Sequence, residues 1–154
     1  MQRKDCMTTT KVKIHFLNNN AKMPVCGSPY SAGYDLHSIC DEQIRIGPHE
    51  TVKMKTGIAV EIPDGYFGAI FARSGIATKR GLRPANCTGV VDSDYRGELI
   101  VALHNDTDQL QFVEPGERIA QLVIMPYLSV EFEESDELSQ TQRGDGGFGS
   151  TGTV

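Results

Sequence analysis

The stretch TVKMKTGIAVEIPDG, residues 51–65, carries the pattern that predicts the fold of this chain. Its apolar side chains alternate with polar ones at Val52, Met54, Ile58, Val60 and Ile62. A period of two places such residues on one face of a β-strand. The closing IPDG predicts a turn, because Pro63 presets φ and Gly65 adopts a positive φ without strain. The stretch therefore predicts β-strands that end in a tight turn.

The same period of two recurs on both sides of this stretch. KVKIHFL at residues 11–17 alternates in the same way, whereas ELIVALHN at 98–105 and RIAQLVIM at 118–125 are typical of more buried strands. Turn signals separate the strands at short spacing, at Gly47-Pro48 and at Glu114-Pro115-Gly116. Many short strands without helical alternation predict an all-β fold, either a sandwich, a jelly roll or a small barrel.

Two segments depart from this strand pattern. SGIATKRG at residues 74–81 predicts one short helix, with Ser74 as its N-cap and Gly81 as its stop. From Glu133 onward the chain becomes acidic and polar, and it ends in the glycine-rich RGDGGFGSTG at 143–152. Such a composition cannot bury enough apolar area to fold by itself. We therefore expect a folded core over residues 1–134 and a flexible arm over residues 135–154.

The bulk composition restricts the class of protein. The chain has 154 residues, enough for one domain with a core, and its net charge of −5 disfavours a general binder of nucleic-acid polymers. A single nucleotide needs only a few placed cations. The longest apolar run is too short to span a bilayer, and the N-terminus lacks an apolar signal segment. The four cysteines lie far apart without a CxxC pair, which favours reduced thiols, so we expect a cytoplasmic protein without membrane contact.

Two segments carry charged side chains that have both a structural and a chemical interpretation. In SAGYDLHS, residues 31–38, Asp35 is either a functional carboxylate or the water-facing residue of an edge strand. In FARSGIATKRG, Arg73 and Ser74 precede a glycine at the start of the predicted helix. Unpaired helix N–H groups beside a guanidinium form a site for a phosphate or carboxylate, although a capped surface turn explains the same residues.

Two further segments leave the same choice. In NCTGVVDSDYRGE, residues 86–98, an apolar pair leads directly into Asp92. A carboxylate at the end of a buried strand acts as a general base or orients water, but DSDYRG also makes a good hairpin turn. In GERIAQL, Gln121 lies among apolar residues. Its amide requires partners if it is buried, which predicts either a structural hydrogen bond or a ligand contact.

The sequence contains no pattern for a protein-built metal cage. Its four histidines, at positions 15, 37, 49 and 104, are dispersed and lack a paired spacing such as HxxxH. It also lacks the GxxxxGK[ST] phosphate loop. We therefore expect any divalent cation to arrive with a polyphosphate ligand.

Five motifs of this chain together resemble one known family. AGYDL, RSG, GVVDSDYRGE, GERIAQL and RGDGGFGSTG occur in the order and at about the spacing of the motifs of the trimeric dUTP pyrophosphatases (dUTPases), over residues 32–152. The resemblance implies a jelly-roll-like, β-clip subunit and a homotrimer whose three active sites each combine motifs of all three chains. It also implies hydrolysis of dUTP to dUMP and pyrophosphate with Mg²⁺. That reaction keeps uracil out of DNA and supplies dUMP for thymidylate synthesis.

The resemblance also implies roles for single residues. Asp92 resembles the carboxylate that activates the attacking water, and Tyr95 the ring under the deoxyribose. Asp35 resembles the acidic residue that contacts the metal through water. The substrate-binding positions that carry over are, on the uracil side, Asn86 and Gly89; on the phosphate side, Arg73, Ser74, Gly75 and Gln121; and, in the closing arm, Arg143, Phe148, Gly149, Ser150 and Thr151.

Two rival classes share part of this pattern. The dCTP deaminases share the fold group, but their motifs resemble the pattern Arg-Ser-Ser and lack a tyrosine after the aspartate pair. This chain instead has Arg73-Ser74-Gly75 and Asp94-Tyr95. A jelly-roll shell subunit without activity leaves Asp92 and the C-terminal motif unexplained. The resemblance assigns no role to Cys87 or to the stretch KRGLRP at residues 79–84.

Overall fold

The computed structural model describes residues 10–147, in which strands predominate. The helix is α1 (Ser74–Arg80). The strands are β1 (Lys13–Phe16), β2 (Val25–Cys26), β3 (Tyr34–His37), β4 (Ile44–Ile46), β5 (Thr51–Lys55), β6 (Ile58–Glu61), β7 (Tyr66–Phe71), β8 (Leu82–Pro84), β9 (Thr88–Val91), β10 (Ile100–Asn105), β11 (Gln111–Val113) and β12 (Arg118–Pro126). The prediction of an all-β chain with a short helix is confirmed for these residues. No helix among them is long and apolar enough to cross a membrane.

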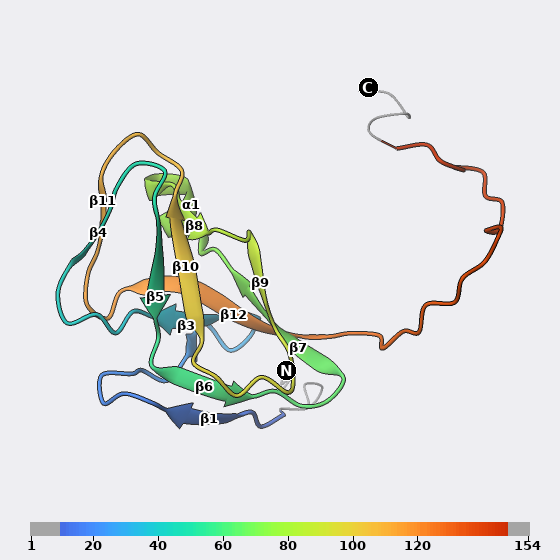
Figure 1. The fold of residues 1–154 in the computed structure, drawn as a ribbon. Helices are drawn as coiled ribbons and strands as arrows, with labels where there is room; N and C mark the ends of the chain where they lie inside the picture. Colours follow the sequence, from blue (N-terminus) through green and yellow to red (C-terminus); the bar gives the residue numbers. More distant parts are fainter. Residues whose placement is uncertain (1–9, 148–154) are drawn as a thin grey trace, which may run out of the picture.

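The strands form four antiparallel sheets that wrap around one core (Figure 1). The largest sheet has the order β2-β3-β12-β7-β9, and a second sheet has the order β5-β10-β8. Two strand pairs, β1-β6 and β11-β4, complete the body. Because β12 lies between β3 and β7, segments that are far apart along the chain become neighbours in the large sheet.

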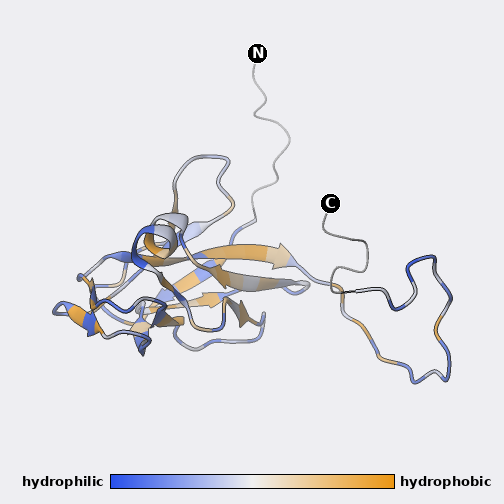
Figure 2. Ribbon diagram, turned by 90° about the horizontal axis from the view of Figure 1, so that it is seen from above, coloured by the Kyte–Doolittle hydropathy of each residue, from blue (hydrophilic) through white to orange (hydrophobic). Residues whose placement is uncertain are grey.

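The stretch at residues 51–65 folds as its alternation predicts. Met54, Ile58, Val60 and Ile62 are each at most 5% exposed and belong to the main core cluster. Tyr66 donates its N–H to the Pro63 carbonyl at 3.1 Å, which closes the predicted turn. Figure 2 shows the apolar stretches concentrated in the strands and the hydrophilic residues in the loops between them. Burial of these branched side chains is the main stabilising contribution to the sheets.

The helix begins one residue earlier than a Ser74 cap requires. Arg73 is the N-cap, with φ −85° and ψ 134°, and it makes no side-chain capping bond, so Ser74 is the first helical residue. The prediction of Ser74 as N-cap is wrong because Arg73 continues the extended backbone of β7 and is held there by its ion pair with Asp35. Gly81 ends the helix as predicted, with φ 62°, and a Cβ at this position would collide with the Thr107 side chain.

The chain leaves the body after β12. Tyr127 makes the last backbone link, from its N–H to the Gly65 carbonyl at 3.0 Å. Beyond it, residues 128–147 form neither helix nor strand, and they run away from the sheets (Figure 1). Large apolar side chains in this arm are open to solvent, with Leu128 at 83% and Phe132 at 95% exposure. The strands thus end before the boundary at residue 134 that composition predicts, and the mobility of the arm stays a prediction.

Candidate active site

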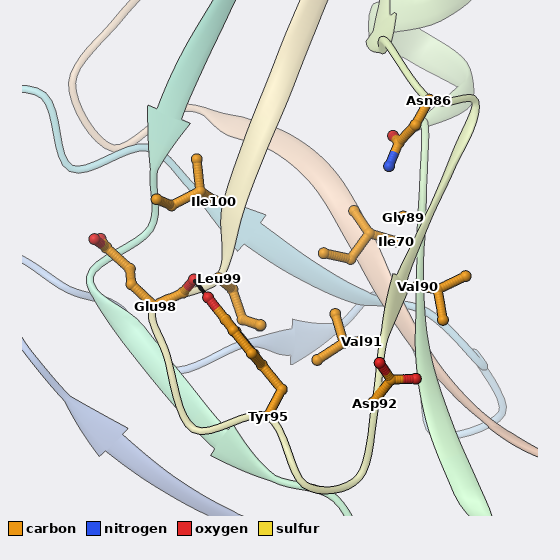
Figure 3. A pocket seen from close by; sticks show the side chains of 10 residues that line it. All are labelled: Ile70, Asn86, Gly89, Val90, Val91, Asp92, Tyr95, Glu98, Leu99 and Ile100. Atoms are coloured by element: carbon orange, nitrogen blue, oxygen red, sulfur yellow. Dashed lines mark hydrogen bonds between the residues drawn. The ribbon is translucent and has the colours of Figure 1, made fainter.

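A cavity of about 220 Å³ opens between β7, β9 and the start of β10 (Figure 3). Its walls combine apolar side chains, among them Ile70, Val91 and Leu99, with a few polar groups at the rim. The predicted residues Asn86, Gly89, Asp92 and Tyr95 all line it. An apolar slot with a few polar groups is typical of a small-molecule site.

The ladder between β7 and β9 creates the space in this pocket. Gly89 pairs with Ile70, and a Cβ at Gly89 would lie 3.2 Å from the Ile70 Cβ and 3.5 Å from the Asn86 Nδ2. A Cβ at position 89 would therefore crowd the Ile70 side chain and lie in van der Waals contact with the Asn86 amide. Glycine at this position keeps the amide accessible from the cavity.

A tight turn after β9 fixes Asp92 and Tyr95 at the opposite end of the pocket. The Tyr95 N–H bonds to the Asp92 carbonyl at 3.1 Å, and the Tyr95 hydroxyl donates to the Glu98 carbonyl at 3.1 Å. A Cβ at Gly97 would collide with the tyrosine ring, so this glycine permits the ring to fold back over the turn. The Asp92 carboxylate is exposed at the mouth (Figure 3). The DSDYRG stretch is thus a structural turn, and that turn holds both predicted side chains at the pocket.

A second cluster of polar side chains surrounds Asp35 on β3, three strands away from β9 in the large sheet. Its carboxylate is only 13% exposed and pairs with Arg73 Nε at 2.6 Å and with Arg118 Nη1 at 3.2 Å. The alternative in which Asp35 faces water from an edge strand is therefore wrong. Register explains the burial, because β3 is covered by β2 on one side and by β12 on the other. Arg118 has no role among the sequence predictions, although it opens the alternating pattern of β12.

Gln121 on β12 lies between the strand that carries Asp35 and the strand that precedes Arg73. It lies opposite both Asp35 and Phe71, and its Nε2 donates to the Ala72 carbonyl at 2.9 Å. A Cβ at Gly33 would overlap the Gln121 amide, so the glycine makes room for it. The structural hydrogen bond predicted for Gln121 is present, and it fixes the backbone directly before Arg73. Ser74 and Gly75 are exposed, and a Cβ at Gly75 would meet open space.

The electrostatics of the second cluster favour an anion. Two guanidinium groups face the one carboxylate of Asp35. Beside them, burial and then the charge of Lys22 lower the pKa of His37, whose Nδ1 is buried without a hydrogen-bond partner. His37 is therefore neutral near pH 7 and adds no charge. Within residues 10–147 no group of three or more His, Cys, Asp or Glu side chains has the arrangement of a metal site.

One chain does not bring its two clusters together. Thr88 pairs with Phe71 near Arg73, whereas Asp92 lies four residues further along, roughly 13 Å at strand spacing. Asp35 is also three strands away from β9 in the sheet order, roughly 14 Å. Arg143 lies in the arm, where its Nε donates to the Gly146 carbonyl at 2.8 Å. The other predicted arm residues, Phe148, Gly149, Ser150 and Thr151, lie outside the described residues.

The fold defines an all-β protein with a small pocket and a separate cluster of two arginines around Asp35, an arrangement that suits a nucleotide-processing enzyme. Comparison with known proteins identifies its family. The model of the dUTPase family matches residues 19–152, and the chain belongs to this family.

Two kinds of relatives agree with this assignment. A deoxyuridine 5'-triphosphate nucleotidohydrolase of Desulfitobacterium hafniense is 46% identical over 149 residues, covering 95% of this chain and 99% of the relative. A mutant dUTPase of Staphylococcus bacteriophage 80alpha, solved with dUpNHpp, superposes with a TM-score of 0.83 at 32% identity, over 94% of this chain and 100% of that chain. A mutant dUTPase of phage phi11 of S. aureus, which coordinates a structural Mg(II) ion, gives a TM-score of 0.77 at 27% identity, over 85% of this chain and 100% of that chain. The jelly-roll-like prediction is thereby confirmed.

Proposed function

We propose that this protein hydrolyses dUTP to dUMP and pyrophosphate. The observation that carries the proposal is the pocket in which Asn86, Gly89, Asp92 and Tyr95 converge, in a chain of the dUTPase family. The amide at one end suits the edge of a pyrimidine, and the carboxylate at the other end suits a water molecule. The relative with dUpNHpp supports a deoxyuridine nucleotide as the ligand.

The chemical step assigned to Asp92 is proton acceptance. Water attacks the α-phosphorus, its proton passes to the Asp92 carboxylate, and the bond from the α-phosphorus to the bridging oxygen breaks. Pyrophosphate leaves with that oxygen. Because Asp92 is exposed at the mouth of the pocket, water reaches it directly. The rest of the catalysis comes from positioning and from neutralising phosphate charge.

The donor set agrees with a magnesium ion that is bound mainly by the substrate. When bound, Mg²⁺ would neutralise phosphate oxygens and keep several waters. Both Asp35 oxygens already accept from arginines, and the described residues form no three-ligand group nearby. Each carboxylate oxygen still has acceptor capacity for a water. Asp35 therefore suits a contact to the hydrated ion through water, and the phosphates would supply the direct ligands.

Specificity for the deoxyribose and for uracil follows from shape. The Tyr95 ring, tied down by its bond to Glu98, forms a wall against which a 2′-hydroxyl would collide. A slot shaped for uracil rejects the methyl group of thymine. It also rejects cytosine, whose reversed donor and acceptor edge leaves buried groups unpaired.

We propose further that the active enzyme is a homotrimer with shared sites. The distance between Asp92 and the Arg73 cluster supports this assembly, since a second chain is needed to bring them together. Leu128, Val130 and Phe132 support it as well, because they alternate along the extended arm at 83%, 58% and 95% exposure. Another copy of the chain would cover them.

Sharing can be tested with two inactive variants. Co-expressed Asp92→Asn and Arg73→Ala chains should regain activity, because a mixed trimer combines an intact Asp92 from one chain with an intact Arg73 from another. The mass in solution should be three times that of the chain. Sites made within one chain predict no recovery.

The cellular role follows from the reaction. Removing dUTP keeps uracil out of DNA, and the product dUMP supplies thymidylate synthesis. The three described cysteines, Cys26, Cys40 and Cys87, are free thiols, which supports a reducing compartment and hence the cytoplasm.

The direct test is incubation with dUTP or dCTP in the presence of Mg²⁺, followed by assays for pyrophosphate and ammonia. Pyrophosphate from dUTP alone is the expected result, and chelation of the metal should abolish it. Ammonia from dCTP would assign the chain to the deaminases instead. If neither pyrophosphate nor ammonia forms, the chain is a jelly-roll module without activity.

A further inference from the structure

Backbone hydrogen bonds hold the two ends of the turn that carries Asn86, from the Ala85 N–H to the Ala102 carbonyl at 2.7 Å and from the Thr88 N–H to the Asn86 carbonyl at 2.6 Å. Ala85, Asn86 and Cys87 are all exposed. The Cys87 N–H bonds to the Pro84 carbonyl at 3.0 Å, and Cys87 has a positive φ of 61°. A non-glycine residue in this conformation is strained by itself, so side-chain support beyond these backbone bonds stabilises the turn.

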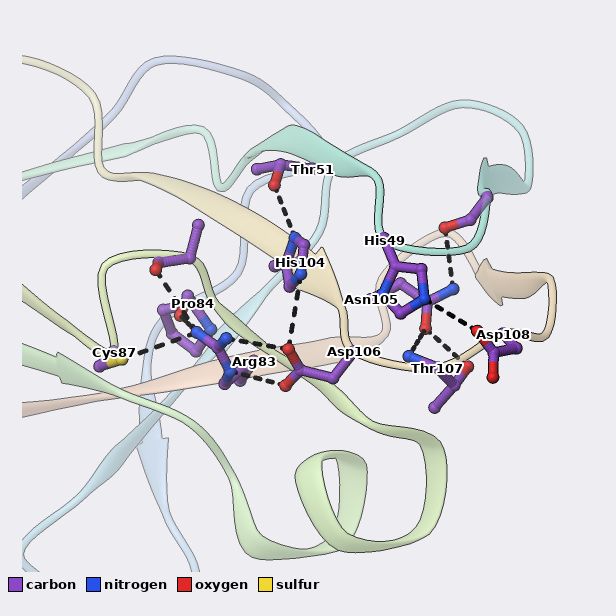
Figure 4. A network of polar contacts seen from close by, with 12 residues as sticks. His49, Thr51, Arg83, Pro84, Cys87, His104, Asn105, Asp106, Thr107 and Asp108 are labelled. Carbon is purple, nitrogen blue, oxygen red and sulfur yellow. Dashed lines mark hydrogen bonds and ion pairs between the residues drawn. The ribbon is translucent and has the colours of Figure 1, made fainter.

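Arg83 provides that support from the preceding strand. Its Nη1 lies 3.1 Å from the Pro84 carbonyl oxygen, 3.4 Å from the Ala85 carbonyl oxygen and 3.6 Å from the Cys87 Sγ. Pro84, Ala85 and Cys87 of the turn thus share one nitrogen of the planar guanidinium group (Figure 4). The fork of N–H donors in arginine suits such multiple contacts, whereas a lysine ammonium lacks it.

The opposite edge of Arg83 is anchored to the body of the protein. Nε and Nη2 bind the two oxygens of Asp106 at 2.6 and 2.8 Å. The hydrogen bond from Arg83 is also the main reason that the pKa of Asp106 is lowered, so this carboxylate stays charged at neutral pH. His104 Nε2 approaches the same carboxylate at 3.4 Å.

Asp106 is itself fixed by the core. Its N–H bonds to the Gly81 carbonyl at 2.8 Å, directly behind the helix. The preceding Asn105 is fully buried, and its Nδ2 donates to the Gly47 and Gln109 carbonyls at 2.9 and 2.7 Å. The buried end of β10 therefore anchors Asp106 through the backbone, and polar contacts lead from Asp106 through Arg83 to the turn at the pocket.

From this geometry we infer that Arg83 is a positioning residue for base recognition, which holds the 84–87 turn so that the Asn86 amide faces the pyrimidine. The inference rests on the proposed function. Arg83 does not touch the cavity itself, since it is absent from the lining residues. Its effect should therefore appear in binding and in base discrimination, and not in the chemical step at Asp92.

Steady-state kinetics of Arg83→Ala test this inference. KM for dUTP should rise roughly tenfold to a hundredfold while kcat stays within about threefold of the wild type. The preference for dUTP over dCTP, as a ratio of kcat/KM values, should fall about tenfold. Arg83→Lys should recover little, because its point charge cannot bind Asp106 and the turn together. Arg45→Ala, which removes an exposed arginine from β4, is the matched control and should change none of these values.

A double-mutant cycle tests whether Asp106 acts through Arg83. Asp106→Asn keeps the side-chain shape and should raise KM in the same direction. The double variant Arg83→Ala with Asp106→Asn should be no worse than the more damaged single variant. Thermal unfolding and solution mass establish that each variant is folded, and Asp106→Asn provides the test if Arg83→Ala does not fold.

The outcomes separate this inference from the proposed function. Wild-type protein without dUTP hydrolysis would refute the function itself. Active wild-type protein together with unchanged KM and unchanged base preference in folded Arg83→Ala would refute the positioning role alone. A fall in kcat at constant KM would also overturn it, since Arg83 would then act on the chemical step.

Discussion

The pocket and the C-terminal arm contrast in how their functional residues are held. The pocket residues lie between Ile70 and Ile100 and are fixed by the β7–β9 ladder and the turn at Asp92. The arm at residues 128–147 has neither helix nor strand and carries Arg143 in an exposed turn. In the proposed function, one chain thus pre-forms the side that would read the base and the sugar. The side that would receive the phosphates needs other segments and, in the proposed trimer, other chains.

This difference has an energetic consequence. Ordering a residue of a free chain costs about 1–2 kcal/mol in backbone entropy. The pocket meets this cost during folding, together with the burial of the core. An arm that orders over a bound nucleotide would meet it only when substrate contacts offset it, which makes closure conditional on the substrate. The contrast predicts that turnover depends on both the pocket and the arm, whereas the stability of the fold depends on the body that contains the pocket and not on the arm.

The largest expected effect is at the pocket mouth. Asp92→Asn should retain nucleotide binding and lose about 10²–10⁴-fold in turnover, because an amide cannot accept the proton of the attacking water. Measurements of kcat and of the affinity for a non-hydrolysable dUTP analogue separate the two effects. Glu98→Gln, at another lining carboxylate, serves as the comparison. Turnover near the wild-type value would remove Asp92 from the mechanism.

The second effect separates activity from stability in the arm. Truncation after Gln142 should leave the thermal unfolding of the body unchanged but reduce turnover by roughly one to several orders of magnitude, about tenfold for each 1.4 kcal/mol lost. Phe148→Ala should reproduce part of this loss, roughly 1–3 kcal/mol, through missing stacking on the base. Full-length Gln142→Ala is the control. Arm amides near Arg143 that are protected from exchange without ligand, or unprotected with it, would contradict the lid hypothesis.

The third effect concerns the sugar. Tyr95→Ala should raise kcat/KM for UTP relative to dUTP by roughly tenfold to a hundredfold, because the wall against a 2′-hydroxyl is removed. Its ring contacts the turn through the bond to Glu98, so unfolding curves must accompany the kinetics. Tyr66→Ala removes a half-exposed ring from the start of β7 and is the matched control. An unchanged ratio would mean that the ring is not the sugar filter.

The contrast also explains how much the sequence could predict. Period-two alternation identified the strands around residues 51–65 and their buried positions, because that pattern depends only on local geometry. The family motifs identified the pocket residues. The pairs Asp35–Arg73, Asp35–Arg118 and Arg83–Asp106 join positions 23 to 83 residues apart and depend on strand register and side-chain reach. Register is set by the folded sheet, so these pairs could not be derived from local pattern.

Phe16 is an instructive failure of the same pattern. It alternates in phase with Val12 and Ile14, which pack on the core, but it is 44% exposed. Within residues 10–147, β1 pairs only with β6, and it lies at the rim of the body (Figure 1). Alternation therefore predicts which residues share one face of a strand. It does not predict how much of that face other elements bury.

The smallest expected effect compares two cysteines. Cys87 has a φ of 61° in the pocket turn, where a side chain costs about 1–2 kcal/mol, whereas Cys26 lies in β2 without a positive φ. Cys87→Gly should relieve that strain against a glycine entropy cost of about 0.5–1 kcal/mol, for a net stabilisation of roughly 0.5 kcal/mol. Cys26→Gly incurs the entropy cost without any relief and should destabilise the protein. Both changes remove a thiol, so thermal midpoints at one fixed protein concentration compare mainly the backbone terms, with an expected difference of a few degrees. Midpoints that move in the same direction would show that contacts of the Cys87 side chain, including the 3.6 Å approach of Arg83, outweigh the strain of its backbone.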